Sequence, residues 1–225
     1  MPPADLSPTM RDYLAEVYRL TERGQTPGGY IGTSALADLL DVSPPAVNRM
    51  ITKLKDAGLL EHEPYQGIRL TETGRREALK ELRRHRIAEA FLVNVMGFKW
   101  HEVHAEAEQL SRGMNETLTE RMATMAGHPA VCPHGEPIPT PEGEITPMDD
   151  GLLSDAPHDT EMEITRVLTR EPDRLEYLAA LGLTPGTRLR VLHAAPFHGP
   201  LQLKVGREYR IIGHNLAELI RAQVV

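Results

Sequence analysis

The chain has 225 residues, of which 40% are hydrophobic, a composition typical of globular proteins. Its formal net charge of −7 argues against a protein whose whole surface binds nucleic acid. Its single cysteine, Cys132, excludes an intrachain disulfide framework and fits a reducing compartment. The N-terminus lacks the basic and apolar regions of a signal peptide, and no apolar run approaches the ~18 residues of a membrane span, so we expect a cytoplasmic protein.

The N-terminal third has the element order of a winged helix-turn-helix. Apolar residues at helical spacing predict a helix over residues 10–21 and a shorter one over 35–40. After a turn, the Pro44-Pro45 pair opens a third helix, which ends at Gly58. Two extended segments joined by a turn at residues 65–67 predict the hairpin that forms the wing.

The third of these helices is the predicted recognition helix, whose N-terminal residues would enter the major groove of DNA. Residues 42–86 carry ten Lys and Arg against six Asp and Glu, an excess of four positive charges inside an acidic chain. A basic helix face is often only a solvated surface, but the element order favours DNA binding. Asn and Arg on this helix can contact base edges, and helix starts can meet phosphates. The predicted DNA contacts are Thr33, Ser34, Ser43, Pro45, Asn48, Arg49, Lys53 and Arg69.

The central stretch, residues 83–114, contains two His-x3-Glu pairs. His85 precedes Glu89 by four residues, and His104 precedes Glu108 by four, so each pair lies one turn apart on one helix face. Two such pairs on adjacent helices can converge as nitrogen and oxygen ligands, a set that suits Mn, Fe, Co, Ni or Zn. From the sequence alone, one interpretation is that all four residues share one ion.

The rest of the chain divides into a helical and a strand-rich part. Residues 82–96 and 100–125 form two amphipathic helical runs, whose Met-rich apolar surface is either core or a dimer seam. Residues 127–157 resemble a linker, in which Cys132-Pro133-His134 is interpreted as a structural turn because it has no further ligand partners. Short strands over 163–167, 187–192, 201–205 and 209–212, with a helix over 175–181, predict a small barrel.

Six segments in chain order carry a resemblance to a known family: YLAEVYRL, SPPAVNRMITKLKDAGLL, GIRLTETGRREA, RHRIAEAFL, VHAEAE and CPHGEPIP. With them the chain resembles the DtxR/MntR family of metal-dependent transcriptional repressors. The resemblance runs from about residue 10 to 139 and more weakly through a C-terminal part similar to the FeoA-type domain of longer members. It implies a homodimer in which a divalent metal ion orders two winged helices for a palindromic operator.

The resemblance also implies ligands, position by position. One family site takes a His and a Glu from the RHRIAE-type segment and a His from the VH-type segment, which match His85, Glu89 and His104. In longer members a Glu from the third domain joins them, and the segment LTREPDRLEYL offers Glu171, with Arg174 where a Gln often stands.

A second family site matches this chain only in part. Asp12 occupies its position on the first helix, as in manganese-type members, and Glu108 matches its next ligand. Ser111 and Arg112 stand where the following two ligands are expected, and an arginine cannot ligate a cation. The second site is therefore altered, degenerate or rebuilt, and His101, Glu102 and Glu106 are nearby substitutes only if the helix register differs.

We therefore expect a mainly α protein with small β parts. Residues 1–74 would form the winged helix-turn-helix, 75–140 the helical metal-binding and dimerisation domain, 141–159 a linker, and 160–225 a FeoA-like small β-barrel.

The expected function is metal-dependent repression in manganese or iron homeostasis, with Mn(II) as the first choice of ion and Fe(II) as the second. Two alternatives remain open at this point. A metallohydrolase could use the His/Glu site, although no HExxH helix, nucleophile elbow or phosphate loop supports an enzyme. A winged-helix regulator could instead sense a non-metal ligand.

Overall fold

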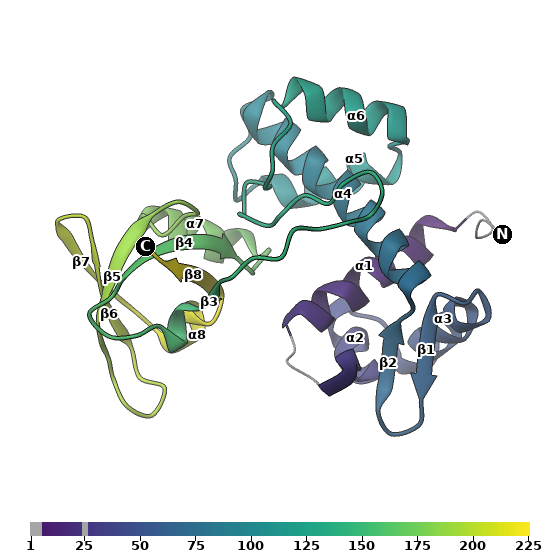
Figure 1. The fold of residues 1–225 in the computed structure, drawn as a ribbon, viewed down its shortest axis with the longest axis horizontal. Coiled ribbons are helices and arrows are strands. Elements are labelled where there is room, and N and C mark those ends of the chain that lie inside the picture. Colours follow the sequence, from purple (N-terminus) through teal and green to yellow (C-terminus); the bar gives the residue numbers. More distant parts are fainter. Residues whose placement is uncertain (1–5, 24–26) are drawn as a thin grey trace. The chain divides into compact units, whose positions relative to one another are not determined.

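The computed structural model describes residues 6–23 and 27–225, and the chain divides into two compact units (Figure 1). The first unit comprises Met1–Arg84 and Pro139–Ile145, and the second comprises His85–Ile138 and Thr146–Val225. Among the described residues, no helix has both the length and the apolar character needed to cross a bilayer.

The first unit contains the predicted helix-turn-helix. The chain can turn between the second and third helices because Asp41 adopts the left-handed conformation (φ 50°). The N–H of Asp41 caps the C-terminus of the second helix. Ser43 is extended at the start of the third helix, and Pro44 occupies the first helical turn, where its missing N–H costs nothing. The helices are α1 (Pro8–Arg23), the short η1 (Pro27–Gly29), α2 (Thr33–Leu40) and α3 (Pro44–Asp56).

The wing is the antiparallel hairpin of β1 (Leu60–Glu63) and β2 (Gly67–Leu70) (Figure 1). Ile31 bridges to Ile68 and extends the hairpin on one side. Gly67 is required there, because its φ is +112° and a Cβ would lie 2.1 Å from the carbonyl oxygen of Ile31.

The apolar stripe of α3 faces the core of this unit. Val47, Ile51 and Leu54 are buried against residues of α1, α2 and the wing, whereas the polar residues between them are exposed. Burying such a stripe fixes the rotation of α3 about its axis and leaves one polar face toward solvent.

The helix α4 (Glu72–Asn94) begins in the first unit, and its last ten residues belong to the second. Those ten residues pack with α5 (Val103–Arg112) and α6 (Glu116–Met125) around Ile87, Leu92, Val103 and Met122. The prediction of one helical run over residues 100–125 was wrong, because α5 ends at Arg112 and α6 starts at Glu116. The side chain of Asn115 accepts a hydrogen bond from the N–H of Leu118 and so caps the new helix.

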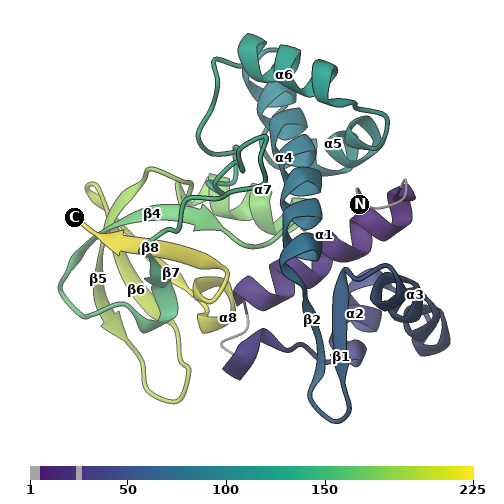
Figure 2. The same cartoon turned by 45° about the vertical axis from the view of Figure 1, so that its right-hand side comes forward.

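The C-terminal part is a six-stranded antiparallel sheet in the order β3-β8-β4-β5-β6-β7 (Figure 2). The pairing establishes a sheet with β3 and β7 as its outer strands, and not by itself a closed barrel. The remaining elements are β3 (Gly151–Leu152), η2 (Leu153–Asp155), β4 (Glu161–Val167), α7 (Pro172–Ala180), β5 (Arg188–Ala194), β6 (Leu201–Val205), β7 (Glu208–Ile212), α8 (His214–Ala217) and β8 (Ile220–Val224).

The segment predicted as a linker over 141–159 contributes to this sheet. Gly151 and Leu152 pair with β8, and Leu153 is fully buried in the core of the sheet domain. Before them, Asp150 buries its carboxylate among Thr165, Arg166 and Arg221, with contacts of 2.7 to 3.0 Å. These hydrogen bonds satisfy a charge that would otherwise be costly to bury.

Candidate metal centre

Helix α4 places His85 and Glu89 on one face, since residues four apart lie one turn apart. Nε2 of His85 lies 3.2 Å from Oε1 of Glu89. Both side chains are buried, with exposed fractions of 9% and 4%. The predicted pairing of these two residues is therefore present in the structure.

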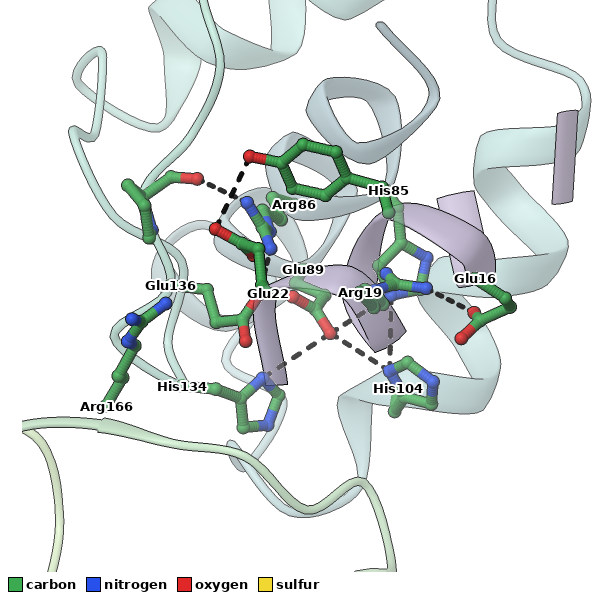
Figure 3. Close-up of polar contacts among 12 residues, drawn as sticks. Glu16, Arg19, Glu22, His85, Arg86, Glu89, His104, His134, Glu136 and Arg166 are labelled. Carbon is green, nitrogen blue, oxygen red and sulfur yellow. Dashed lines mark hydrogen bonds and ion pairs between the residues drawn. The ribbon is translucent and has the colours of Figure 1, made fainter. Parts of the chain in front are cut away.

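His104 joins them from the first turn of α5. Its Nδ1 lies 3.1 Å from Oε1 of Glu89 and 3.2 Å from Nε2 of His85 (Figure 3). The two imidazole rings meet edge to face, at 67° and with centroids 4.8 Å apart. Val103 and Ala107 are fully buried on the same helix and hold this face of α5 inward.

The spacing of these three atoms fits a metal ion. Ligands ~2.1 Å from an ion lie ~3.0–3.5 Å from one another in octahedral or tetrahedral geometry. The separations of 3.1 and 3.2 Å between the ligand atoms of His85, Glu89 and His104 fall in that range. Two imidazole nitrogens and a carboxylate oxygen, directed at one another in a buried place, are a donor set suited to a divalent transition metal.

The electrostatics of the site keep its carboxylate ionised. Burial alone would raise the pKa of Glu89, but the neighbouring His85, His104 and His134 hold that pKa well below its usual value. Glu89 is therefore an anionic oxygen donor at neutral pH, in a place where an unpaired charge would be costly.

His134 is a member of this site that the sequence interpretation missed. Its Nδ1 lies 3.4 Å from Oε1 of Glu89 (Figure 3), and its Nε2 donates to the carbonyl of Trp100 at 2.8 Å. The Trp100 contact holds the ring so that Nδ1 faces Glu89, as partners behind metal-ligating histidines commonly do. Burial would lower the pKa of His134, but Cys132 and Glu89 beside it raise that pKa to about 11.

Cys132 and His134 lie in a loop that other contacts hold in place. Residues 133–135 form the predicted turn, yet Glu89, Cys132 and His134 also bring one ligand atom each within 4.8 Å of one another. The main-chain carbonyl of His134 accepts a hydrogen bond from Val167 of β4 at 2.9 Å. Next to it, Gly135 (φ +84°) leaves no room for a Cβ, which would lie 1.9 Å from the carbonyl oxygen of Thr165.

No sequence signal connected this loop to α4. Cys132 and His134 follow Glu89 by more than forty residues, and a Cys-x-His spacing alone matches no ligand pattern used for the prediction. The loop is tied to α4 by the buried Arg86, which pairs with Glu136 and donates to the carbonyl of Pro137. These contacts become visible only in the structure.

The structure does not bring the other predicted ligands of the second unit into this group. Glu108 is exposed and pairs with Arg112 at 2.7 Å, so the interpretation in which it shares one ion with the other three gains no support. Glu171 is 62% exposed at the start of α7, where it pairs with Arg174 at 2.8 Å. Asp12 lies on α1, in the first unit.

The predicted DNA contacts lie on the surface of the first unit. Thr33 and Ser34 form the start of α2, and the predicted residues of α3 are exposed. Arg69 on β2 is engaged, because its Nε lies 2.6 Å from Glu61 and its guanidinium lies over the ring of Tyr30. The predicted contacts on α3 and at its N-terminus, all of them exposed, are Ser43, Pro45, Asn48, Arg49 and Lys53.

Three family models match the chain in succession. Residues 5–68 match the N-terminal DNA-binding domain of iron-dependent repressors, and residues 71–140 match their metal-binding and dimerisation domain. Residues 152–224 match the FeoA domain.

Whole-length relatives agree with these matches. The iron-dependent repressor IdeR of Mycobacterium tuberculosis is 29% identical over 233 residues, covering 98% of this chain and 99% of IdeR. A solved manganese-dependent transcriptional repressor in complex with manganese is 31% identical, with a TM-score of 0.88 over 96% of this chain and 100% of that one. The structure of ScaR with bound Zn2+ is also 31% identical, with a TM-score of 0.82 over 96% and 99%.

Proposed function

This chain belongs to the DtxR/IdeR family of metal-dependent DNA-binding repressors, and from that premise we propose that it controls manganese or iron homeostasis through the site around Glu89. It is a transcriptional repressor by family, not an enzyme, so the metallohydrolase alternative is set aside. The observation that carries the proposal is the convergence of His85, Glu89 and His104 within 3.2 Å.

In the proposed site, His85 and Glu89 ligate from α4, and His104 ligates from α5. His134 supplies a further ligand from the loop through Nδ1, in a second group of donors that it forms with Glu89 and the Sγ of Cys132. A bound divalent ion supplies the positive charge that holds these donors together. Because these ligands come from two helices and a loop, their binding to one ion would fix the relative positions of those elements.

The donor set favours Mn(II) as the physiological ion, with Fe(II) as the second candidate. Imidazole and carboxylate ligands accept Mn, Fe and Zn, and the choice among them depends on geometry and availability more than on intrinsic affinity. The similarity to a manganese-bound repressor supports manganese, and the zinc-bound ScaR structure shows that a similar protein accepts another ion. The buried thiol of Cys132 is the feature that could favour Fe(II) or Zn(II).

The DNA partner is proposed to be a palindromic operator bound by a homodimer. The exposed face of α3 is the groove-reading surface, and the start of α2 would meet the phosphate backbone. The dimer seam is proposed on exposed apolar residues of α6 and of the segment directly after α4, because a monomer gains nothing from exposing them. These residues are Val95, Met96, Leu118 and Met125.

The mechanism is thermodynamic linkage between the two partners. If the ion-bound arrangement fits the operator better, then metal raises the affinity for DNA, and DNA raises the affinity for metal by the same factor. Asp12 stays a predicted ligand of a second site and Glu171 of the first, whereas the ion pair of Glu108 with Arg112 argues against Glu108 as a ligand of the second site.

The test is an operator-binding titration at buffered free Mn(II), Fe(II) and Zn(II), with wild type and His85→Ala compared. We expect Mn(II) or Fe(II) to raise the operator affinity of the wild type at free ion concentrations well below those at which the ions bind nonspecifically to the protein. We expect His85→Ala to lose this effect. Equal stimulation of both proteins would remove the ligand assignment. Operator binding that responds only to Zn(II) would replace the proposed ion while keeping the site.

A further inference from the structure

We propose that the C-terminal sheet domain carries a second, exposed transition-metal site formed by His198, His214 and Glu218. The proposal goes beyond the function above, because these residues belong to neither the Glu89 site nor the predicted second site. It rests on three side chains from two separate segments, the β5–β6 connection and the short helix α8 with the residue after it.

Nε2 of His214 faces a donor atom of each of the other two side chains, and Glu218 must turn toward His198 to complete the group. Nδ1 of His198 lies 2.9 Å from Nε2 of His214, and the two rings meet at 82° with centroids 4.6 Å apart. The same Nε2 lies 3.4 Å from Oε1 of Glu218. Both separations are close to the ~3.0–3.5 Å expected between neighbouring ligands of one ion.

The backbone at His198 has an energetically unfavourable conformation. Residues 196–199 form a tight turn in which the N–H of Gly199 donates to the carbonyl of Pro196 at 3.2 Å. Its two central residues, Phe197 and His198, both have positive φ, of 59° and 55°. Hairpin turns of this kind are usually built from Asn-Gly, because other residues are strained there. A bulky aromatic and a histidine in those positions point to a use for the imidazole.

The second segment is held independently. His214 is the first residue of α8, with an exposed side-chain fraction of 19%, so the ring is fixed in position while its Nε2 still meets His198. Glu218 follows four residues later, one turn along, and its side chain is 53% exposed. That exposure lets the carboxylate swing from His214 toward an ion shared by the two rings. Ala217, between them, is fully buried and anchors α8 on the sheet.

This donor set selects a class of ion. Two imidazoles and one carboxylate suit borderline ions such as Zn(II), Cu(II) and Ni(II), with water completing the coordination. Because the site is at the surface, it should bind more weakly and exchange faster than the buried site around Glu89. An ion here would join the turn at residues 196–199 to α8 and so stabilise the strained backbone.

A second pair of histidines on the same domain serves as the matched control. His158 and His193 also meet edge to face, but their centroids are 6.0 Å apart, and in the described part of the chain they belong to no group of three donor atoms. An imidazole pair without a third ligand should bind zinc only as loosely as any surface histidine.

The experiment is zinc binding by the full chain, with Zn(II) as the only added metal. The variants are His198→Asn, His214→Gln, Glu218→Gln and the control His158→Asn. Asparagine tolerates positive φ, so His198→Asn should keep the turn while removing the ligand. We expect His198→Asn and His214→Gln each to lose one zinc equivalent per chain, Glu218→Gln to weaken that equivalent at least tenfold, and His158→Asn to match the wild type.

The outcome is separated from that of the proposed repressor function by measuring operator binding with Mn(II) in parallel. His198→Asn should leave the Mn(II)-stimulated operator affinity unchanged, whereas His85→Ala should lose it and keep the surface zinc equivalent. Equal zinc stoichiometry in wild type, His198→Asn and His214→Gln would overturn the proposal. So would an equal loss in His158→Asn, because it would mean that surface histidines bind zinc without a built site.

Discussion

Nδ1 of His134 lies 3.4 Å from Oε1 of Glu89, so a residue of the loop after α6 faces a carboxylate buried on α4. The other nitrogen of the ring donates to the carbonyl of Trp100 at 2.8 Å, which sets the ring's orientation. The candidate metal centre is therefore closed by a loop and not only by the two helices that carry the His-x3-Glu pairs.

The first prediction concerns this loop residue. His134→Gln should weaken Mn(II) binding by ~10–100-fold, because it removes a proposed ligand and the hydrogen bond that orients it. The measurement is Mn(II) affinity by calorimetry. The matched control is His128→Gln, since His128 is exposed and outside both ligand groups. Unchanged affinity in His134→Gln would return this residue to the purely structural role first assigned to its turn.

The sequence predicted the local features of the fold well, because they depend on periodicity and caps. The stripe of Val47, Ile51 and Leu54 identified the buried face of α3, and the four-residue spacing identified His85 with Glu89. The sequence analysis missed His134 because its position depends on a loop that the side chain of Arg86 holds against α4, and no periodic pattern encodes such a contact. The break at Asn115 escaped because the apolar pattern continues across it, and only the cap marks the new helix.

The second prediction concerns Glu108, which the resemblance assigned to a second site. Because Glu108 pairs with Arg112 on an exposed helix face, Glu108→Gln should change stability by less than ~1 kcal/mol. It should also leave the number of bound Mn(II) ions unchanged. Metal stoichiometry by equilibrium dialysis checks this, with Glu106→Gln as a control on the same helix. Loss of one equivalent in Glu108→Gln alone would establish a second site despite Ser111 and Arg112.

The third prediction separates base reading from phosphate contact on α3. Arg49→Ala should cost ~1–3 kcal/mol of discrimination between operator and random DNA, because an arginine can bind a guanine edge through two hydrogen bonds. Lys53→Ala should weaken binding to both DNAs alike and lower the salt slope by about 1. Competition binding at several salt concentrations measures both. Equal losses on operator and random DNA for Arg49→Ala would reassign that residue to the phosphate backbone.

The fourth prediction concerns the acid stability of the sheet domain. Burial would raise the pKa of Asp150, but hydrogen bonds from Arg166, Thr165 and Arg221 hold it below its usual value. A depressed carboxyl pKa stabilises the fold fully above the unfolded value of ~3.9, and this contribution is lost as pH falls below that value toward the folded one. Removing one partner of such a buried pair costs ~3–5 kcal/mol.

Asp150→Asn should therefore lower the thermal stability of the sheet domain at pH 7, and the difference from wild type should shrink as the pH falls below ~4. Unfolding scans from pH 7 down to about pH 2, followed by circular dichroism, test this, because the contribution is lost only below the unfolded pKa of ~3.9. The control is Asp149→Asn, the preceding residue. A constant difference at all pH values would show that the charge of Asp150 is not the source of its effect.

The central claim is that a metal ion held around Glu89 controls operator binding. The most direct measurement is the operator affinity of protein stripped of metal by a chelator, before and after one equivalent of Mn(II) per chain is restored. The account predicts that restoration raises the affinity by ~5–150-fold, the usual range of such coupling. An operator affinity that is the same for the stripped and the restored protein would contradict it.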